Sequence, residues 1–266
     1  MEVDSLRIAF AANRNIGLQS LRLLLEHQIE PVALLLPSDN TDGSSAAMRQ
    51  LLPHVPELTG RQIHSHDVVG KLRALELDFI LSVHFPYIFS PKILRLPRVG
   101  TLNLHPALLP FNRGWHTPSW AILENTPYGA TLHWVDEGMD TGDIALQREV
   151  SVLPSDTADS LYARALAAEL DVLREAIPLL KAGILPRMPQ RGQGTTHVKA
   201  ELDAVRRLDL EASMPVGDML RIVRSLTTNR GGEAAWFELD GTRYLIQISI
   251  RRDVSEVSDV PMKRAA

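Results

Sequence analysis

The sequence of 266 residues contains no cysteine. Disulfide bonds, thiolate nucleophiles and cysteine metal ligands are therefore excluded. Long apolar runs are missing as well, so no stretch of the sequence is suited to crossing a bilayer. The N-terminal stretch MEVDSLRIAF has neither the basic flank nor the apolar run of a signal peptide. We therefore expect no membrane partner and a cytoplasmic location.

An excess of charge of one sign is also missing. The chain has 28 Lys and Arg against 32 Asp and Glu, which gives a net charge of -4. Nucleic-acid-binding domains usually carry a basic surface, so we expect no nucleic acid partner. Hydrophobic residues make up 45% of the chain and charged residues 23%, a composition that suits one large globular domain or two smaller ones.

The order of apolar segments predicts an α/β fold. A strand over 6–11, a helix over 16–28 and a strand over 31–37 follow one another, which indicates a βαβ unit in a parallel sheet. Further elements are expected as follows: strands over 61–65, 77–84, 100–105, 129–136 and 143–150, and helices over 65–77 and 156–181. The predicted fold class is a Rossmann-like, mainly parallel sheet with flanking helices, followed by a small C-terminal α+β subdomain.

The composition changes near Gly183, and this change predicts the domain organisation. We expect a large N-terminal domain over 1–183 and a linker or crossing loop, rich in Pro, Gly and Gln, over 184–200. A small subdomain is expected over 201–252 and a flexible tail over 253–266.

A β-hairpin is expected inside the small subdomain. Asp240-Gly241 lies between two strand-like runs, and this dipeptide favours a two-residue turn. The two runs carry apolar residues on both faces, among them Trp236, Phe237 and Tyr244. A small subdomain does not cover both faces of such a hairpin, so we predict that one face packs on a second copy in a homodimer.

The strand over 100–105 ends with two polar residues on one face. Side chains alternate along a strand, so Asn103 and His105 share a face while Leu102 and Leu104 occupy the other. The carboxyl ends of parallel strands are the usual ligand-binding edge of an open α/β sheet. The segment that follows contains Pro106, which helps to stiffen it.

A second polar segment, VDEGMDTGD, follows the strand over 129–136. If this strand neighbours the one over 100–105, Asp140 reaches His105. A carboxylate beside an imidazole favours its protonated form and fixes its orientation. An amide and an imidazolium at one edge stabilise a developing oxyanion, a combination that serves acyl transfer without a covalent nucleophile. No Gly-x-Ser-x-Gly motif of a serine hydrolase is present.

From these residues alone two interpretations stay open. In the first, Asn103, His105 and Asp140 form a catalytic site. In the second, the strand end is a hydrogen-bonded structural feature and the Asp- and Gly-rich segment is a series of turns, which both residue types favour.

The segments NLHPALLPFNRG and GATLHWVDEGMDTGDI carry a resemblance to a known family. They resemble the signature of the formyltransferases that use 10-formyltetrahydrofolate, most closely those acting on nucleotide-linked amino sugars. The family pattern is Asn-x-His, a Leu-Leu-Pro loop that ends in Arg-Gly or Lys-Gly, and a later Asp in a Gly-containing turn. The resemblance covers roughly residues 6 to 180 and makes 1–183 the catalytic domain.

The resemblance implies catalytic roles for three residues. Asn103 and His105 would hold the formyl oxygen as it becomes an oxyanion, and Asp140 would keep His105 charged and assist proton transfer. The formyl donor would be 10-formyltetrahydrofolate, bound as a cosubstrate, and no metal is expected. The nucleophile would be a neutral amine of the acceptor.

The resemblance also implies where the pterin of the folate binds. The matching positions are Pro86, Tyr87 and Ile88 in HFPYIFSP, and Asp136 and Gly138 in the later loop. Ordinary core packing remains an alternative for the aromatic residues of the first of these segments.

A nucleotide-linked amino sugar is the acceptor that the resemblance favours. The segment FNRGWHTPSWAI and the C-terminal residues resemble those of the sugar enzymes, which act in lipopolysaccharide or O-antigen biosynthesis. The residues expected to contact this acceptor are Asn112, Arg113, Trp115 and His116, with Arg113 on a phosphate. The alternatives are methionyl-tRNA or another amine as acceptor, or hydrolysis of formyltetrahydrofolate.

Overall fold

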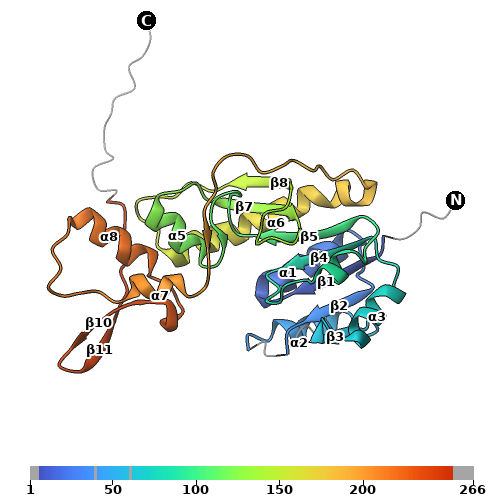
Figure 1. Cartoon of the computed structure of the whole chain (residues 1–266), viewed down its shortest axis with the longest axis horizontal. Coiled ribbons are helices and arrows are strands. Elements are labelled where there is room, and N and C mark those ends of the chain that lie inside the picture. The colour runs from blue at the N-terminus through green and yellow to red at the C-terminus, as the bar shows by residue number, and fades with distance from the viewer. Residues whose placement is uncertain (1–5, 39–40, 60–61, 254–266) are drawn as a thin grey trace, which may run out of the picture.

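The computed structural model describes residues 6–38, 41–59 and 62–253. Its centre is a seven-stranded sheet with the order β3-β2-β1-β4-β5-β7-β8 (Figure 1). The strands are β1 (Ile8–Ala12), β2 (Ala33–Leu36), β3 (Glu57–Thr59), β4 (Phe79–Val83), β5 (Gly100–His105), β7 (Gly129–Trp134) and β8 (Ile144–Glu149). The tail predicted over 253–266 lies, apart from Asp253, outside the described residues.

The first five strands of the sheet order pair in parallel, whereas β7 and β8 are antiparallel. Every residue of β1, β2 and β4 is buried, because both faces of a parallel sheet are covered by helices. The covering helices are α1 (Arg14–Glu26), α2 (Ser44–Leu51), α3 (His66–Ala74), α4 (Pro91–Leu94) and α6 (Ala158–Ala182), whereas α5 (Thr117–Glu124) packs against α6. The predicted fold class is confirmed.

Two hydrophobic clusters occupy the two faces of the sheet. Along β1, Ile8 and Phe10 belong to the cluster that includes residues of α1 and α6, whereas Ala9 and Ala11 belong to the one that includes residues of α3. This division follows from the alternation of side chains along a strand. The apolar runs of the sequence are therefore continuous because each face of the strand has its own core.

The strand predicted over 61–65 is wrong. The third strand, β3, lies earlier in the chain, and the described residues 62–65 form turns instead. Ser65 ends these turns as the N-cap of α3, with its hydroxyl accepting a hydrogen bond from the backbone N–H of Val68 at 3.2 Å. The backbone of an N-cap residue is extended, as it is in a strand, but Ser65 begins a helix instead of continuing a strand.

The C-terminal part lies at the opposite end of the molecule from β2 and β3 (Figure 1). It contains α7 (Glu201–Arg206), α8 (Val216–Ser225), the short 3₁₀ helix η2 (Gly231–Glu233), β10 (Ala235–Leu239) and β11 (Thr242–Ile246). The predicted hairpin is confirmed, with Asp240 and Gly241 both at positive φ as its two-residue turn requires.

The crossing segment over 184–200 is attached to the large domain. Its strand β9 (Thr196–His197) pairs in parallel with β6 (Arg113–Gly114), and Met188 forms a bridge with Ile144 of β8. The Trp134 indole N–H donates to the backbone oxygen of Pro186 at 2.7 Å. The segment therefore contributes to the structure around β7 rather than only joining two parts.

The strand order identifies the edge at which a ligand would bind. The chain leaves β1 for β2 on one side of it, and β4 later pairs with β1 on the other side. Open α/β sheets bind ligands at such a switch point, outside the carboxyl ends of the strands. The residues that follow β1 and β4 and those at the end of β5 meet there.

Candidate active site

A cavity of about 640 Å³ opens at the carboxyl ends of β1, β4 and β5. It is lined by Asn13 and Arg14 after β1, by residues 84–89 after β4, and by Asn103 and His105 of β5. The C-terminal part of the chain also contributes to its wall, with Thr228, Asn229, Arg230 and Glu233. A volume of this size accommodates a small-molecule ligand.

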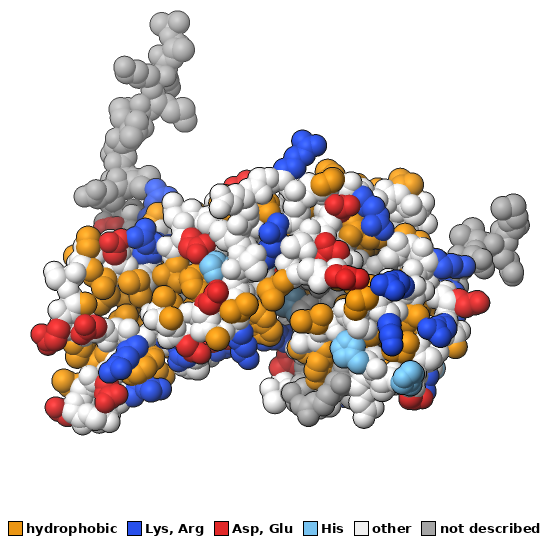
Figure 2. Space-filling view, viewed as in Figure 1, with side chains coloured by type: hydrophobic (Ala, Val, Ile, Leu, Met, Phe, Trp, Pro, Cys, Tyr) orange, Lys and Arg blue, Asp and Glu red, His pale blue; other side chains and the backbone are white. Residues whose placement is uncertain are grey.

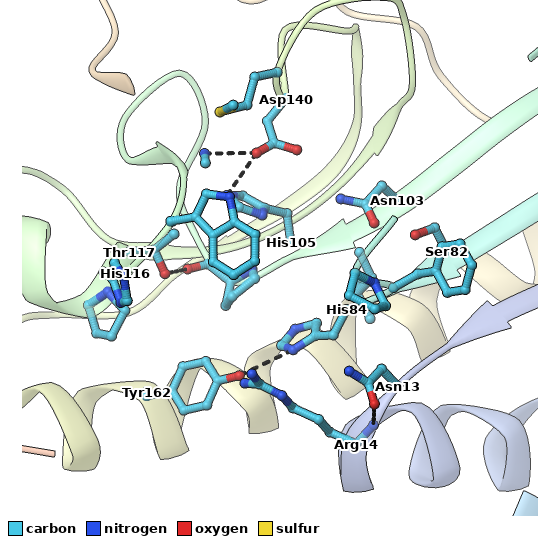
Figure 3. Close-up of a pocket in the computed structure, with 18 of the residues that line it drawn as sticks. Asn13, Arg14, Ser82, His84, Asn103, His105, His116, Thr117, Asp140 and Tyr162 are labelled. Atoms are coloured by element: carbon cyan, nitrogen blue, oxygen red, sulfur yellow. Dashed lines mark hydrogen bonds and ion pairs between the residues drawn. The ribbon is translucent and has the colours of Figure 1, made fainter. Parts of the chain in front are cut away.

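Four polar side chains form one group in the wall of this cavity, and Figure 3 labels three of them, Asn103, His105 and Asp140. Nε2 of His105 lies 3.6 Å from Oδ2 of Asp140, and Nε2 of His133 lies 3.4 Å from Oδ1 of the same carboxylate. The Asn103 amide nitrogen lies 3.2 Å from His133 Nε2. Nε2 of His105 also forms a hydrogen bond with the backbone oxygen of Asn112, at 3.3 Å.

Asp140 is held by a backbone group of the loop that follows β5. The N–H of Gly114 donates to Asp140 Oδ2 at 2.8 Å, and Asp140 itself has a positive φ of 53°. Gly114 has a φ of 87°, and a Cβ at this position would lie 2.3 Å from the backbone oxygen of His197. Glycine is therefore required where the loop that follows β5 approaches both Asp140 and β9.

The crossing segment supplies a further support through Gln190. Its amide donates to the backbone oxygens of Asp140 and Gly142, both at 2.8 Å. The guanidinium of Arg113 donates in turn to Gln190 Oε1 at 2.7 and 3.1 Å. Arg113 and Gln190 therefore hold the backbone of the loop that carries the carboxylate.

Burial and charge act in opposite directions on the pKa values of His105 and Asp140. Burial lowers the pKa of His105, and the nearby Asp140 only partly offsets it. Burial by itself would raise the pKa of Asp140, but the charge of His105, the interactions with His133 and the Gly114 N–H together hold it well below its usual range. Asp140 is thus an anion at neutral pH, and the lowered pKa of His105 favours the neutral form of the imidazole beside it.

Comparison with protein families identifies the chain. Residues 25–177 match the family described as formyl transferase. The chain belongs to the formyl transferase family. Residues 201–252 match a second model, described as the N-formyltransferase dimerization C-terminal domain. The family resemblance carried by the Asn-x-His and Asp-containing motifs is confirmed, and the protein is an enzyme that transfers formyl groups.

Proteins of several kinds are similar to the chain in sequence. Methionyl-tRNA formyltransferase of Symbiobacterium thermophilum is 29% identical over 229 residues, which are 83% of this chain and 70% of that protein. Human cytosolic 10-formyltetrahydrofolate dehydrogenase is 36% identical over 133 residues, which are 49% of this chain and only 15% of that much longer protein.

Solved structures with the same fold include two sugar enzymes. A sugar N-formyltransferase of Shewanella superposes with a TM-score of 0.81 at 20% identity, covering 93% of this chain and 99% of that one. The formyltransferase PseJ of Anoxybacillus kamchatkensis superposes with a TM-score of 0.54 at 27% identity, covering 74% and 88%. That structure contains UDP-4,6-dideoxy-4-formamido-L-AltNAc and tetrahydrofolate.

Seven of the residues proposed for ligand contacts line the cavity of the enzyme: Pro86, Tyr87, Ile88, Trp115, His116, Asp136 and Gly138. Ile88 is 79% exposed, and the ring of Tyr87 packs edge-on against Phe85. Asp136 accepts hydrogen bonds from the Gly138 N–H at 2.9 Å and from the Thr141 hydroxyl at 2.7 Å. The loops expected to hold the folate therefore face one cavity.

The structure does not bring the side chains of Asn112 and Arg113 to the cavity. Asn112 is fully buried, and its amide donates to the Thr126 hydroxyl at 3.0 Å and to the backbone oxygen of Pro127 at 3.2 Å. Arg113 is turned toward Gln190. A sequence pattern places both residues in the correct loop but does not reveal which way each side chain turns.

Several residues of the cavity wall are not evident from the sequence. The residue His133 lies opposite Asn103 in the register of β5 and β7, a relationship that requires knowledge of the strand pairing. His84 directly follows β4 and Arg14 is the second residue after β1, so a predicted switch point between these strands would have indicated them. No comparable signal marks Tyr162, Arg230 or Glu233.

Two negative findings concern the described residues alone. Within 6–38, 41–59 and 62–253, no group of three or more His, Cys, Asp and Glu side chains is arranged to hold a metal ion. None of the helices in these ranges is both long and apolar enough to span a membrane.

Proposed function

We propose that the enzyme transfers a formyl group from 10-formyltetrahydrofolate to the amine of a nucleotide-linked amino sugar. The observation that carries this proposal is the convergence of Asn103, His105 and Asp140 in the wall of one cavity. The structural likeness to PseJ, whose structure holds a nucleotide-linked sugar and tetrahydrofolate together, supports the choice of both substrates.

The mechanism begins with attack of the neutral acceptor amine on the formyl carbon. The formyl oxygen becomes an oxyanion, which the Asn103 amide stabilises by a hydrogen bond and which His105 stabilises once its ring has taken up a proton. Because Asn112 O and Asp140 only accept hydrogen bonds, Nε2 of His105 carries its proton and Nδ1 is free to accept one. The amine loses a proton, the bond from the formyl carbon to N10 breaks, and N10 of the folate takes up a proton as it leaves.

The charge distribution suits proton transfer through His105. A neutral imidazole accepts the proton of the attacking amine, and the resulting imidazolium lies 3.6 Å from the Asp140 carboxylate, which stabilises it. Asp140 therefore acts on the protonated form of His105 during the reaction rather than keeping the ring charged beforehand.

A small acceptor fits the cavity better than a tRNA. Arg14 and Arg230 are the only Lys or Arg residues among the described residues that line it. Binding of a nucleic acid usually requires many phosphate contacts along a basic surface. Methionyl-tRNA remains the second candidate acceptor, because the relative from Symbiobacterium thermophilum aligns over 83% of the chain.

A direct assay tests the proposed acceptor. The enzyme is incubated with 10-formyltetrahydrofolate and a panel of dTDP- and UDP-linked amino sugars, with methionyl-tRNA, or without acceptor. We expect tetrahydrofolate and a formylated sugar nucleotide to appear in equal amounts. Formylation of methionyl-tRNA alone would overturn the choice of acceptor, and release of formate without an acceptor would identify a hydrolase instead.

We also propose a second copy of the chain as a partner. Apolar side chains gather over α8 and the hairpin at one end of the molecule (Figure 2). Val216 is 75% exposed and Leu245 is 54% exposed. Residues 201–252 match the model described as a dimerization domain, and an exposed apolar surface of this kind is typical of a subunit interface.

A further inference from the structure

A second polar group lies across the cavity from Asp140 (Figure 3). Glu169 of α6 is fully buried, and its two carboxylate oxygens lie 2.9 and 3.0 Å from Nε2 of His84. Nδ1 of the same ring lies 3.2 Å from the hydroxyl of Tyr162. The guanidinium of Arg14 forms a hydrogen bond with this hydroxyl. The mechanism proposed above uses none of these four residues.

The chemistry of the two end groups determines the direction of the two outer hydrogen bonds in this chain. Arginine only donates and a carboxylate only accepts. The Arg14 guanidinium therefore donates to the Tyr162 oxygen, and His84 Nε2–H donates to Glu169. The hydroxyl of Tyr162 and Nδ1 of His84 join these two bonds, so the buried carboxylate holds the guanidinium of Arg14 in place through the two side chains between them.

A second arginine approaches the same tyrosine from the other end of the sequence. The guanidinium carbon of Arg230 lies 5.8 Å from the centre of the Tyr162 ring. Its Nη1 lies 3.1 Å from Glu233 Oε1, and Oε2 of Glu233 lies 3.6 Å from His116 Nδ1. Glu233 is therefore shared between Arg230 and His116.

We infer that Arg14 and Arg230 together bind the diphosphate of the acceptor, and that Glu169, His84 and Tyr162 position Arg14 for this contact. This inference rests on the proposed function. Both arginines line the cavity, and Arg14 forms no ion pair with a carboxylate of the described residues. A diphosphate offers two anionic groups, and a guanidinium binds a phosphate with paired N–H donors.

This assignment gives the C-terminal part of the chain a role in choosing the acceptor. The segment around Arg230 follows α8 and reaches the wall of the cavity, whereas Asn103 and His105 belong to the central sheet. The reacting groups and the phosphate-binding groups therefore come from different parts of the chain. Arg113, which the sequence suggested for the phosphate, supports the Asp140 loop instead.

The first experiment measures binding of the nucleotide part alone. Calorimetric titration with dTDP, UDP and inorganic pyrophosphate is performed on the whole chain and on the variants Arg14→Gln and Arg230→Gln. We expect each substitution to weaken the binding of dTDP or UDP at least about tenfold, as loss of a charge-assisted contact does. Affinity for the folate should change by less than about twofold, because the folate is assigned to other loops.

Matched controls separate this effect from a general loss of charge. Arg148 on β8 has a side-chain exposure of 42%, close to the 39% of Arg230, and it also pairs with a carboxylate but lies outside the cavity. Arg148→Gln should leave nucleotide affinity unchanged. Circular dichroism checks the fold of each variant, and Arg14→Lys should restore part of the affinity that Arg14→Gln removes.

The positioning role of Tyr162 has its own readout. Tyr162→Phe removes the hydroxyl that joins Arg14 to His84 and keeps the ring beside Arg230. We expect a higher KM for the acceptor with little change in kcat, and no further effect when Tyr162→Phe is combined with Arg14→Gln. Additive effects of the two substitutions would overturn the positioning role.

Failure of this inference and failure of the proposed function give different results. If the enzyme formylates a nucleotide-linked sugar but both arginine variants keep normal acceptor KM and nucleotide affinity, the diphosphate assignment is overturned and the function stands. If the unmodified enzyme neither binds dTDP or UDP nor formylates any nucleotide-linked sugar, both are overturned.

Discussion

The amide of Asn103 and the imidazole of His133 lie opposite each other on β5 and β7, with 3.2 Å between Asn103 Nδ2 and His133 Nε2. The other nitrogen of His133 donates to the backbone oxygen of Trp134 at 2.8 Å, which fixes the ring. Asp140 Oδ1 lies 3.4 Å from His133 Nε2. Asn103 is thus joined to the Asp140 carboxylate through the ring of His133, and His105 lies directly beside the same carboxylate.

The first prediction concerns the charge of Asp140. Asp140→Asn keeps the shape of the side chain but removes the anion that stabilises protonated His105. We expect kcat to fall by about a hundredfold, a typical cost of losing an electrostatic group of this kind. Asp143→Asn, three positions later and outside the cavity, is the control. Steady-state kinetics measure kcat for both variants. Near-normal turnover in a folded Asp140→Asn variant would contradict the mechanism.

The second prediction concerns the pH dependence of His105. Burial lowers its pKa below the usual value of about 6.5, so the ring is neutral at neutral pH. If the neutral ring accepts the amine proton, kcat/KM should decrease as the pH falls through this lowered pKa. The same shift makes the folded state lose stability as the pH falls below about 6.5, because the unfolded chain then binds a proton first.

Two substitutions should move the pKa of His105 in opposite directions. Asp140 raises this pKa, so Asp140→Asn should lower it further, whereas His133 lowers it, so His133→Gln should raise it. Titration of the His105 ring signals by nuclear magnetic resonance measures both shifts. Shifts in the same direction for the two variants would contradict the opposite effects of Asp140 and His133 on the pKa of His105.

The third prediction distinguishes two roles for Arg113: support of the Asp140 loop through Gln190, and contact with a phosphate of the acceptor. Gln190→Ala removes the hydrogen bonds to the backbone oxygens of Asp140 and Gly142, so kcat should fall by about ten- to a hundredfold through misplacement of the carboxylate. Arg113→Ala should have a smaller effect of the same kind, with the acceptor KM unchanged. Arg191→Ala, on an exposed neighbour, is the control. A raised acceptor KM in Arg113→Ala would instead support a phosphate contact.

The fourth prediction concerns assembly. Light scattering should give the mass of a dimer for the unmodified chain and of a monomer for Val216→Glu or Leu245→Glu, because a buried carboxylate in the proposed interface is unfavourable. Ile184→Glu changes a side chain that is 64% exposed but lies outside the C-terminal part, and this variant should remain a dimer. A monomeric unmodified chain at micromolar concentration would contradict the proposal.

Local patterns were sufficient for most of the central sheet, though not for β3, and for part of the site. Continuous apolar runs predicted β1, β2 and β4 because a strand buried on both faces has no polar side. The alternation along β5 predicted that Asn103 and His105 share a face, and Asp240-Gly241 predicted the hairpin turn. These features depend on residues close in sequence, whose relative positions follow from backbone geometry alone.

Only the tertiary structure decided which distant residues meet in the cavity. Glu169 and His84 are 85 positions apart, and Gln190 lies 50 positions from Asp140. The approach of Arg14 and Arg230 to one tyrosine depends on how the whole C-terminal part packs against the sheet. Contacts of this kind are set by packing across the core and by the path of the connecting loops, and no local pattern encodes either. The residue types in the sequence indicated the chemistry, and the packing determined which side chains carry it out and which ones hold them in place.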